Sequence, residues 1–135
     1  MNSSATRGDG FAGFVVEQMA VAGRPRLRRM FGGHGIYLDD VFVAIIADER
    51  LYLKADEQTR QRFEAQGLRA FTYARNGKPF SLGYYEAPAE VFESPAEMAQ
   101  WARLAISAAL RAQSRKPAPG ESLASRGKDT RRTPR

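Results

Sequence analysis

The residues with the clearest chemical potential lie between positions 28 and 37, where two arginines are followed by three glycines within four positions. Backbone N–H groups of a glycine turn can form a concave nest for an anion, and nearby cationic side chains would add positive charge. The single histidine lies between the glycines and is a candidate general base near neutral pH. The stretch lacks the lysine–serine ending of a phosphate-binding loop, so we favour a tight strand reversal, with an anion site as the alternative. The candidate residues are Arg28, Arg29, Gly32, Gly33, His34, Gly35 and Lys54.

A second group combines aromatic and basic side chains around the dipeptide Asn76-Gly77, which is typical of a tight hairpin. Such a surface would stack nucleobases in a protein that binds single-stranded nucleic acid. The same pattern is ordinary cross-strand packing in a sheet, and we favour packing because the body of the chain is nearly neutral. The residues are Tyr73, Arg75, Lys78, Tyr84 and Tyr85.

The sequence has few residues that could bind a metal ion or act as a nucleophile. The chain has no cysteine and one histidine, so a conventional His/Cys metal site lacks ligands. The acidic residues in positions 39–57 fall at expected turns and helix starts, where capping groups are expected. We therefore predict no catalytic residue, no metal site, no cofactor and no enzymatic activity.

The net charge of +6 is concentrated at the end of the chain. Residues 114–135 hold seven basic and two acidic side chains, whereas the other 113 residues hold 14 basic and 13 acidic ones. The end segment is also rich in proline, serine and threonine, so we expect a disordered basic tail with weak, nonspecific attraction to nucleic acid. Its candidate contacts are Arg115, Lys116, Arg126, Lys128, Arg131, Arg132 and Arg135.

Length and composition favour one small domain, because 135 residues with 43% hydrophobic content can build a single core. We expect a flexible N-terminus over residues 1–10, a domain over residues 11–113 and the tail over residues 114–135. No apolar run approaches the roughly 18 residues that span a bilayer, so we expect a cytoplasmic protein that does not contact membranes.

The elements that must position these residues follow from hydrophobic periodicity. Apolar residues at three- and four-residue spacing predict a first helix with Asp9 as its cap, and Ser94-Pro95-Ala96-Glu97 predicts the start of a long terminal helix. Alternating segments between them predict strands. The predicted elements are a helix at 11–22, strands at 27–31, 35–38, 41–47 and 51–54, a helix at 56–67, strands at 71–73 and 80–85, and a helix from 95.

This α-β-β-β-β-α-β-β-α order predicts an α+β two-layer sandwich with a mainly antiparallel sheet. The segment 41–47, V-F-V-A-I-I-A, is apolar on both faces, so we expect a central strand that is covered on more than one side.

The chain resembles the TfoX N-terminal domain family over roughly residues 11 to 112. The resemblance rests on an ordered series of motifs: R-R-M-F-G-G-H-G-I-Y, A-D-E-R-L-Y-L-K-A-D, F-T-Y-A-R-N-G-K-P, Y-Y-E-A-P-A-E-V and W-A-R. It implies a sandwich like that of secretion chaperones. Full-length TfoX proteins resemble this chain only in their first half and add a helical domain linked to coactivation of competence genes.

Three functions therefore stay open. The first is a non-enzymatic regulatory domain that binds a protein partner, in the transcription machinery, through an exposed sheet face or edge. The second is a small-molecule or anion-binding module, or an uncharacterised enzyme, centred on Arg28, Arg29 and the glycine turn. The third is a homodimeric scaffold.

Overall fold

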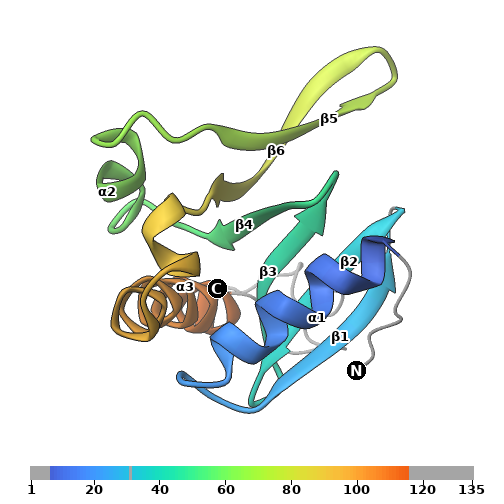
Figure 1. Cartoon of the computed structure of the whole chain (residues 1–135). Coiled ribbons are helices and arrows are strands. Elements are labelled where there is room, and N and C mark those ends of the chain that lie inside the picture. The colour runs from blue at the N-terminus through green and yellow to red at the C-terminus, as the bar shows by residue number, and fades with distance from the viewer. Residues whose placement is uncertain (1–6, 31, 116–135) are drawn as a thin grey trace, which may run out of the picture.

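The computed structural model describes residues 7–30 and 32–115 and confirms the predicted α+β class (Figure 1). Each predicted helix and strand is present. The elements are α1 (Arg7–Met19), β1 (Pro25–Met30), β2 (Gly33–Leu38), β3 (Val41–Ala47), β4 (Arg50–Lys54), α2 (Arg60–Glu64), β5 (Ala70–Arg75), β6 (Lys78–Glu86), the 3₁₀ helix η1 (Ala89–Phe92) and α3 (Pro95–Arg115).

The six strands form one antiparallel sheet in the order β1-β2-β3-β4-β6-β5. Strands β1 to β4 are a meander, and the β5–β6 hairpin then adds to it through β6. Strand β3 lies between β2 and β4, and Val43, Ala44, Ile45 and Ile46 are all buried. The central position predicted for this strand is confirmed.

Three hairpin turns have two consecutive residues with positive φ. They are Asp39-Asp40 (49° and 68°), Asp48-Glu49 (53° and 58°) and Asn76-Gly77 (54° and 77°). Positive φ at both central positions is the geometry of a type I′ turn, whose twist matches that of the flanking strands. Only the third turn has the residues that this geometry favours, so the first two hold side chains in a costly backbone region.

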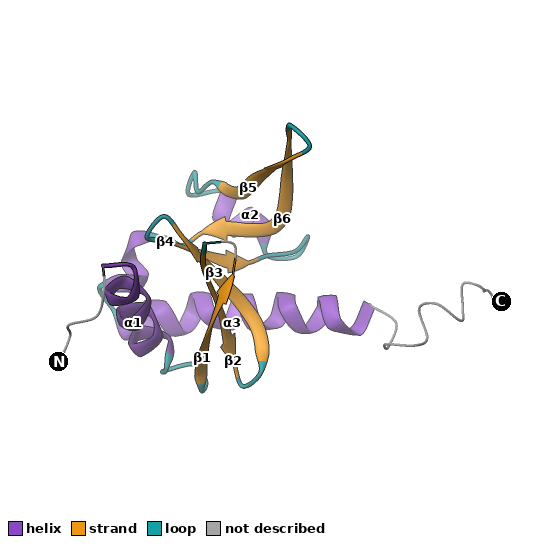
Figure 2. Ribbon diagram, turned by 90° about the vertical axis from the view of Figure 1, so that its right-hand side faces the viewer, coloured by secondary structure: helices purple, strands orange, loops and turns teal. Residues whose placement is uncertain are grey.

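One face of the sheet packs against the helices and forms the core. Ile36, Ala44 and Leu53 lie opposite one another on neighbouring strands and are almost fully buried. Both α1 and α3 contact this part of the sheet and each other, and Figure 2 shows α3 running past the strands toward its C-terminal end. The Gln18 side chain of α1 donates hydrogen bonds to the Val91 and Phe92 carbonyl oxygens of η1 at 3.4 and 3.5 Å. The start and the end of the chain therefore share one core.

Several predicted boundaries were wrong. Helix α1 begins at Arg7, so Asp9 lies inside the helix and not at its cap, and the helix ends at Met19. Helix α2 is shorter than predicted because residues 56–59 form a turn that caps it, and η1 was not predicted. Helix α3 continues two residues beyond the expected domain end at Gln113. Within the described residues, no helix combines the length and apolar character that a membrane span requires.

Candidate functional site

The glycine stretch is a tight reversal between β1 and β2. Met30 pairs directly with Gly33, and Gly32, just before Gly33, has a φ of +75°. A Cβ atom at Gly33 would overlap the Ile46 carbonyl oxygen, and one at Gly35 would lie 2.5 Å from the Phe42 ring. Close packing therefore accounts for Gly33 and Gly35, and the positive φ of the turn accounts for Gly32.

The surroundings of this turn are not those of an anion site. A hollow of about 180 Å³ beside it is lined by His34, Asp48 and Glu49, together with Gly32, Gly33 and Ile46. Two carboxylates at its wall would repel an anion. Arg28 and Arg29 are exposed on β1.

The structure does not bring Lys54 to the glycine turn. Lys54 ends β4, whereas Arg50 begins that strand beside the turn at Asp48-Glu49, and four residues of strand span about 13 Å. The predicted anion site is thus divided between the two ends of the sheet.

The predicted aromatic and basic surface is also divided. Tyr84 and Tyr85 are neighbours on β6, so they point to opposite faces of the sheet. The Tyr85 ring stacks on Phe63 in the core, and its hydroxyl donates to Glu64 Oε2 at 2.7 Å, which raises the Tyr85 pKa. Lys78 is exposed at the start of β6. The backbones of Tyr73 and Arg75 lie in β5, but their side chains fall outside the described part of the structure.

Tyr84 belongs to a row of rings on the sheet face away from the core. A β-bulge places Phe42 opposite Tyr37, with Ala44 opposite Ile36, so that Val43 is the extra residue. The ring centroids are 5.0 Å apart for Tyr37 and Phe42, and 5.9 Å apart for Phe42 and Tyr84. A cationic side chain lies over the ring at each end of this aromatic row. The Arg26 guanidinium lies 4.3 Å from the Tyr37 ring centroid, and Lys54 Nζ lies 5.0 Å from that of Tyr84.

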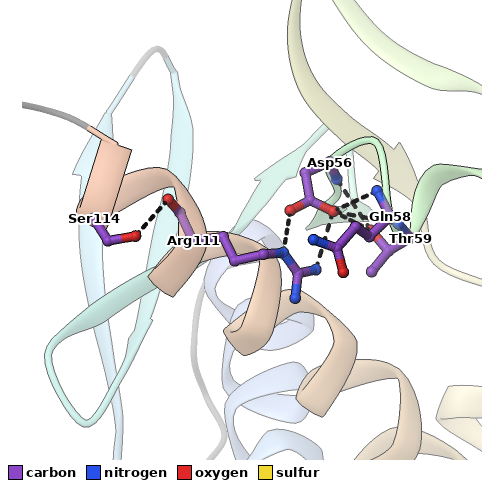
Figure 3. Close-up of polar contacts among 5 residues, drawn as sticks. All are labelled: Asp56, Gln58, Thr59, Arg111 and Ser114. Carbon is purple, nitrogen blue, oxygen red and sulfur yellow. Dashed lines mark hydrogen bonds and ion pairs between the residues drawn. The ribbon is translucent and has the colours of Figure 1, made fainter.

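A partly buried ion pair lies beside Lys54 and ties the segment before α2 to the end of α3 (Figure 3). Arg111 Nε donates to Asp56 Oδ2 at 2.6 Å, and Arg111 Nη2 donates to Asp56 Oδ1 at 3.1 Å. The Asp56 side chain is only 8% exposed and also accepts the backbone N–H groups of Gln58 and Thr59. The Arg111 hydrogen bond is the main reason why the Asp56 pKa is lowered. The capping role expected of acidic residues at this point is confirmed for Asp56.

Two hollows near this ion pair share Lys54 in their lining. The corner hollow, of about 170 Å³, lies between the aromatic row and α3, and the outer hollow, of about 500 Å³, lies between the 54–58 segment and the last residue of α3. The corner hollow is lined by Phe42, Lys54, Tyr84, Ala109, Ala112 and Gln113. The outer hollow is lined by Lys54, Ala55, Asp56, Glu57, Gln58 and Arg115.

The sequence did not point to Arg111 or Phe42 as site residues. Arg111 is one basic residue on a long helix, and its partner Asp56 is 55 positions away. The bulge that turns Phe42 to the far face is hidden in a segment that is apolar throughout. In the part of the chain that the structure describes, no cluster of three or more His, Asp or Glu side chains is suited to a metal ion.

Of the predicted tail contacts, Arg115 is the last residue of α3. The others lie outside the described residues: Lys116, Arg126, Lys128, Arg131, Arg132 and Arg135.

Comparison with known proteins gives a consistent family. The sequence profile of the TfoX N-terminal domain matches residues 17–109. The chain is 28% identical to Protein Sxy of Escherichia coli (strain K12) over 98 residues, which are 73% of this chain and 47% of that protein. It is 31% identical to the DNA transformation protein TfoX1 of Aliivibrio fischeri (strain ATCC 700601 / ES114) over 71 residues, which are 53% of this chain and 34% of that protein. The chain thus spans less than half the length of these relatives.

Proposed function

Because the chain belongs to the TfoX N-terminal domain family, we propose that it is a regulatory domain that acts by binding a protein partner and catalyses no reaction. Relatives named Protein Sxy and DNA transformation protein TfoX1 support a role in the regulation of DNA uptake. The partner in this proposal is part of the transcription machinery. The observation that carries the proposal is the family match over residues 17–109.

The geometry favours strand β1 as the partner-binding surface. It is the terminal strand of the sheet, and no other described strand lies on its outer side. Its four middle residues, Arg26 to Arg29, are all exposed. An edge strand offers backbone groups to a partner strand, and arginines favour a partner that carries acidic side chains. Two copies of β1 would bring arginines together, so this edge favours a different protein over a homodimer.

A charge reversal on β1 tests this proposal in the organism that encodes the chain. We expect Arg28→Glu to reduce transcription of DNA-uptake genes nearly as much as deletion of the whole chain. Arg103→Glu, on an exposed position of α3, is the matched control and should have little effect. Unchanged transcription after deletion of the chain would contradict the regulatory role. If deletion abolishes transcription but Arg28→Glu has no effect, the regulatory role stands and only the assignment of β1 as the binding surface is contradicted.

We also propose that the basic segment after α3 attracts DNA without sequence preference. Helix α3 runs to Arg115, so the informative comparison is the full chain against residues 1–115. Only the full chain should bind duplex DNA, with an affinity that falls steeply as salt is raised. Tight, salt-sensitive binding by residues 1–115 would show that the attraction lies in the folded body.

A further inference from the structure

The Tyr84 side chain carries a buried polar group that the fold does not use. The residue is 6% exposed, and burial raises its pKa to about 12. Its ring contacts Phe42 and Lys54, yet no hydrogen bond joins its hydroxyl to any residue that the structure describes. Buried tyrosine hydroxyls normally have a hydrogen-bond partner, so this one points to a missing group.

The Tyr84 side chain lines the corner hollow, where there is room for such a group. The α3 wall of this hollow consists of Ala109 and Ala112, whose small side chains leave the space open, and of the Gln113 amide. Phe42 provides an apolar ring on the opposite side. The lining of the hollow thus combines apolar groups with the side chains of a tyrosine, a glutamine and a lysine.

Cationic side chains line the two hollows. Lys54 lines both the corner hollow and the outer hollow, and Arg115 lines the outer one. The nearest buried carboxylate, Asp56, is already neutralised by two hydrogen bonds from Arg111. Glu57 is exposed and does not line the corner hollow. This arrangement contrasts with the hollow at the glycine turn, whose wall carries two carboxylates.

We propose that the corner hollow binds a small organic anion, whose carboxylate or phosphate lies between the Tyr84 hydroxyl and Lys54 and whose apolar body packs on Phe42 and Ala112. The hydroxyl donates to the oxyanion, and the ammonium group gives a charge-assisted hydrogen bond. This site goes beyond partner binding at β1 and is independent of it, because the two surfaces lie on different elements of the fold. The domain then responds to a metabolite as well as to a protein.

The test is NMR titration of the full chain with benzoate, phenyl phosphate and inorganic phosphate, with benzamide as the neutral match of benzoate. We expect benzoate or phenyl phosphate to bind with a dissociation constant on the order of 1 mM or below, and benzamide to bind at least about tenfold more weakly. The stronger of the two aromatic anions identifies the preferred oxyanion. Inorganic phosphate should be weaker than phenyl phosphate, because it lacks the apolar body. The shifted amides should cluster at Lys54, Tyr84 and Ala112.

Three variants separate this site from a structural role. Tyr84→Phe removes only the unpaired hydroxyl, so it should weaken binding about tenfold while the melting temperature stays the same or rises. Lys54→Gln should abolish the preference for an anion, and Ala112→Leu should block binding by filling the hollow. The matched controls are Tyr85→Phe, whose hydroxyl faces Glu64 on the other side of the sheet, and Lys78→Gln, an exposed lysine on the hairpin.

The proposal is overturned if the amide signals of Lys54, Tyr84 and Ala112 do not shift with any of the anions at a concentration about tenfold above the expected dissociation constant. It is also overturned if binding survives Tyr84→Phe, Lys54→Gln and Ala112→Leu, or if the shifted amides lie at the glycine turn. Weaker anion binding in all three variants, with binding unchanged in both controls, supports it.

Discussion

The two ends of the sheet differ in how far apart in the sequence their contacting residues are. The glycine end, between β1, β2 and β3, is built from neighbouring strands, and a Cβ atom would meet the Ile46 backbone at Gly33 and the Phe42 ring at Gly35. The corner end is built from β3, β4, β6 and α3, and its central ion pair joins residues 55 positions apart. The glycine motif, which is conspicuous in the sequence, thus reflects packing. The corner end has a buried hydroxyl without a hydrogen bond and cationic side chains, but no local sequence motif marks it.

The largest effect should come from a substitution at the glycine end. In Gly33→Ala, the added Cβ would overlap the Ile46 carbonyl oxygen, so β2 and β3 must separate. We expect the free energy of unfolding to fall by about 3 kcal/mol, as measured by urea denaturation.

The control for Gly33→Ala is Gly13→Ala, on an exposed position of α1 with no atom within 4 Å of the new Cβ. It should raise the free energy of unfolding by about 0.5–1 kcal/mol. Similar losses in both variants would contradict the packing explanation of the glycine motif.

The next effect should come from the ion pair at the corner end. Asp56→Ala removes the partner of Arg111 and the acceptor of the Gln58 and Thr59 N–H groups, so we expect a loss of about 2–3 kcal/mol. The matched control is Asp40→Asn, because the Arg26–Asp40 pair is exposed and 3.7 Å long. Its loss should be about 0.5 kcal/mol or less. Equal losses of unfolding free energy in the two variants would show that burial does not determine how much each ion pair contributes to stability.

Acid should reduce the stabilisation that the Asp56–Arg111 ion pair gives to the folded state. Hydrogen bonds from Arg111 lower the Asp56 pKa in the folded state, whereas the unfolded chain keeps the ordinary value of about 3.9. The unfolded state therefore binds the proton more readily. The stabilisation is fully present above the ordinary value and is lost as pH falls toward the lowered one.

Urea midpoints between pH 6 and pH 3 check this expectation. Stability of the wild type should decline below about pH 4.5, and Asp56→Asn should decline less over the same range. Identical slopes would mean that other carboxylates, such as Asp39, whose pKa the Arg24 hydrogen bonds also lower, account for the acid sensitivity.

The smallest effect should come from the turn next to the glycine end. Glu49 holds a φ of +58°, which costs energy for a residue with a side chain. Glu49→Gly creates the Asp-Gly pair that a type I′ turn favours, so we expect a gain of about 0.5 kcal/mol by thermal unfolding. A loss of stability would show that the glutamate side chain makes a compensating contact.

Sequence patterns predicted the elements and their order because local signals specify them. Asn76-Gly77 and the alternation on either side located the β5–β6 hairpin, and Ser94 caps α3 as expected by accepting the Glu97 N–H at 3.2 Å. The same patterns predicted α2 too long, since Asp56 bonds to Thr59 in a separate capping turn. Local signals thus fixed where elements lie better than where they begin.

The site was much less predictable. Lys54 and Tyr84 were both selected from the sequence, but each was assigned to a different surface from the one that joins them. Their meeting depends on strand order, on the bulge at Val43 and on the path of α3, and none of these has a signature within a few residues. Chemistry that is assembled across long sequence separations needs the fold before it can be recognised.

The contact between Gln18 of α1 and the η1 carbonyl oxygens has a consequence for biosynthesis. Helix α1 is translated before the other described elements, whereas η1 and α3, which cover part of its apolar side, are the last of them. That part must stay uncovered while more than 70 residues are added, as the separation from Gln18 to Val91 shows. Nascent chains should therefore be bound by chaperones, and this domain should complete its folding only after α3 has been translated.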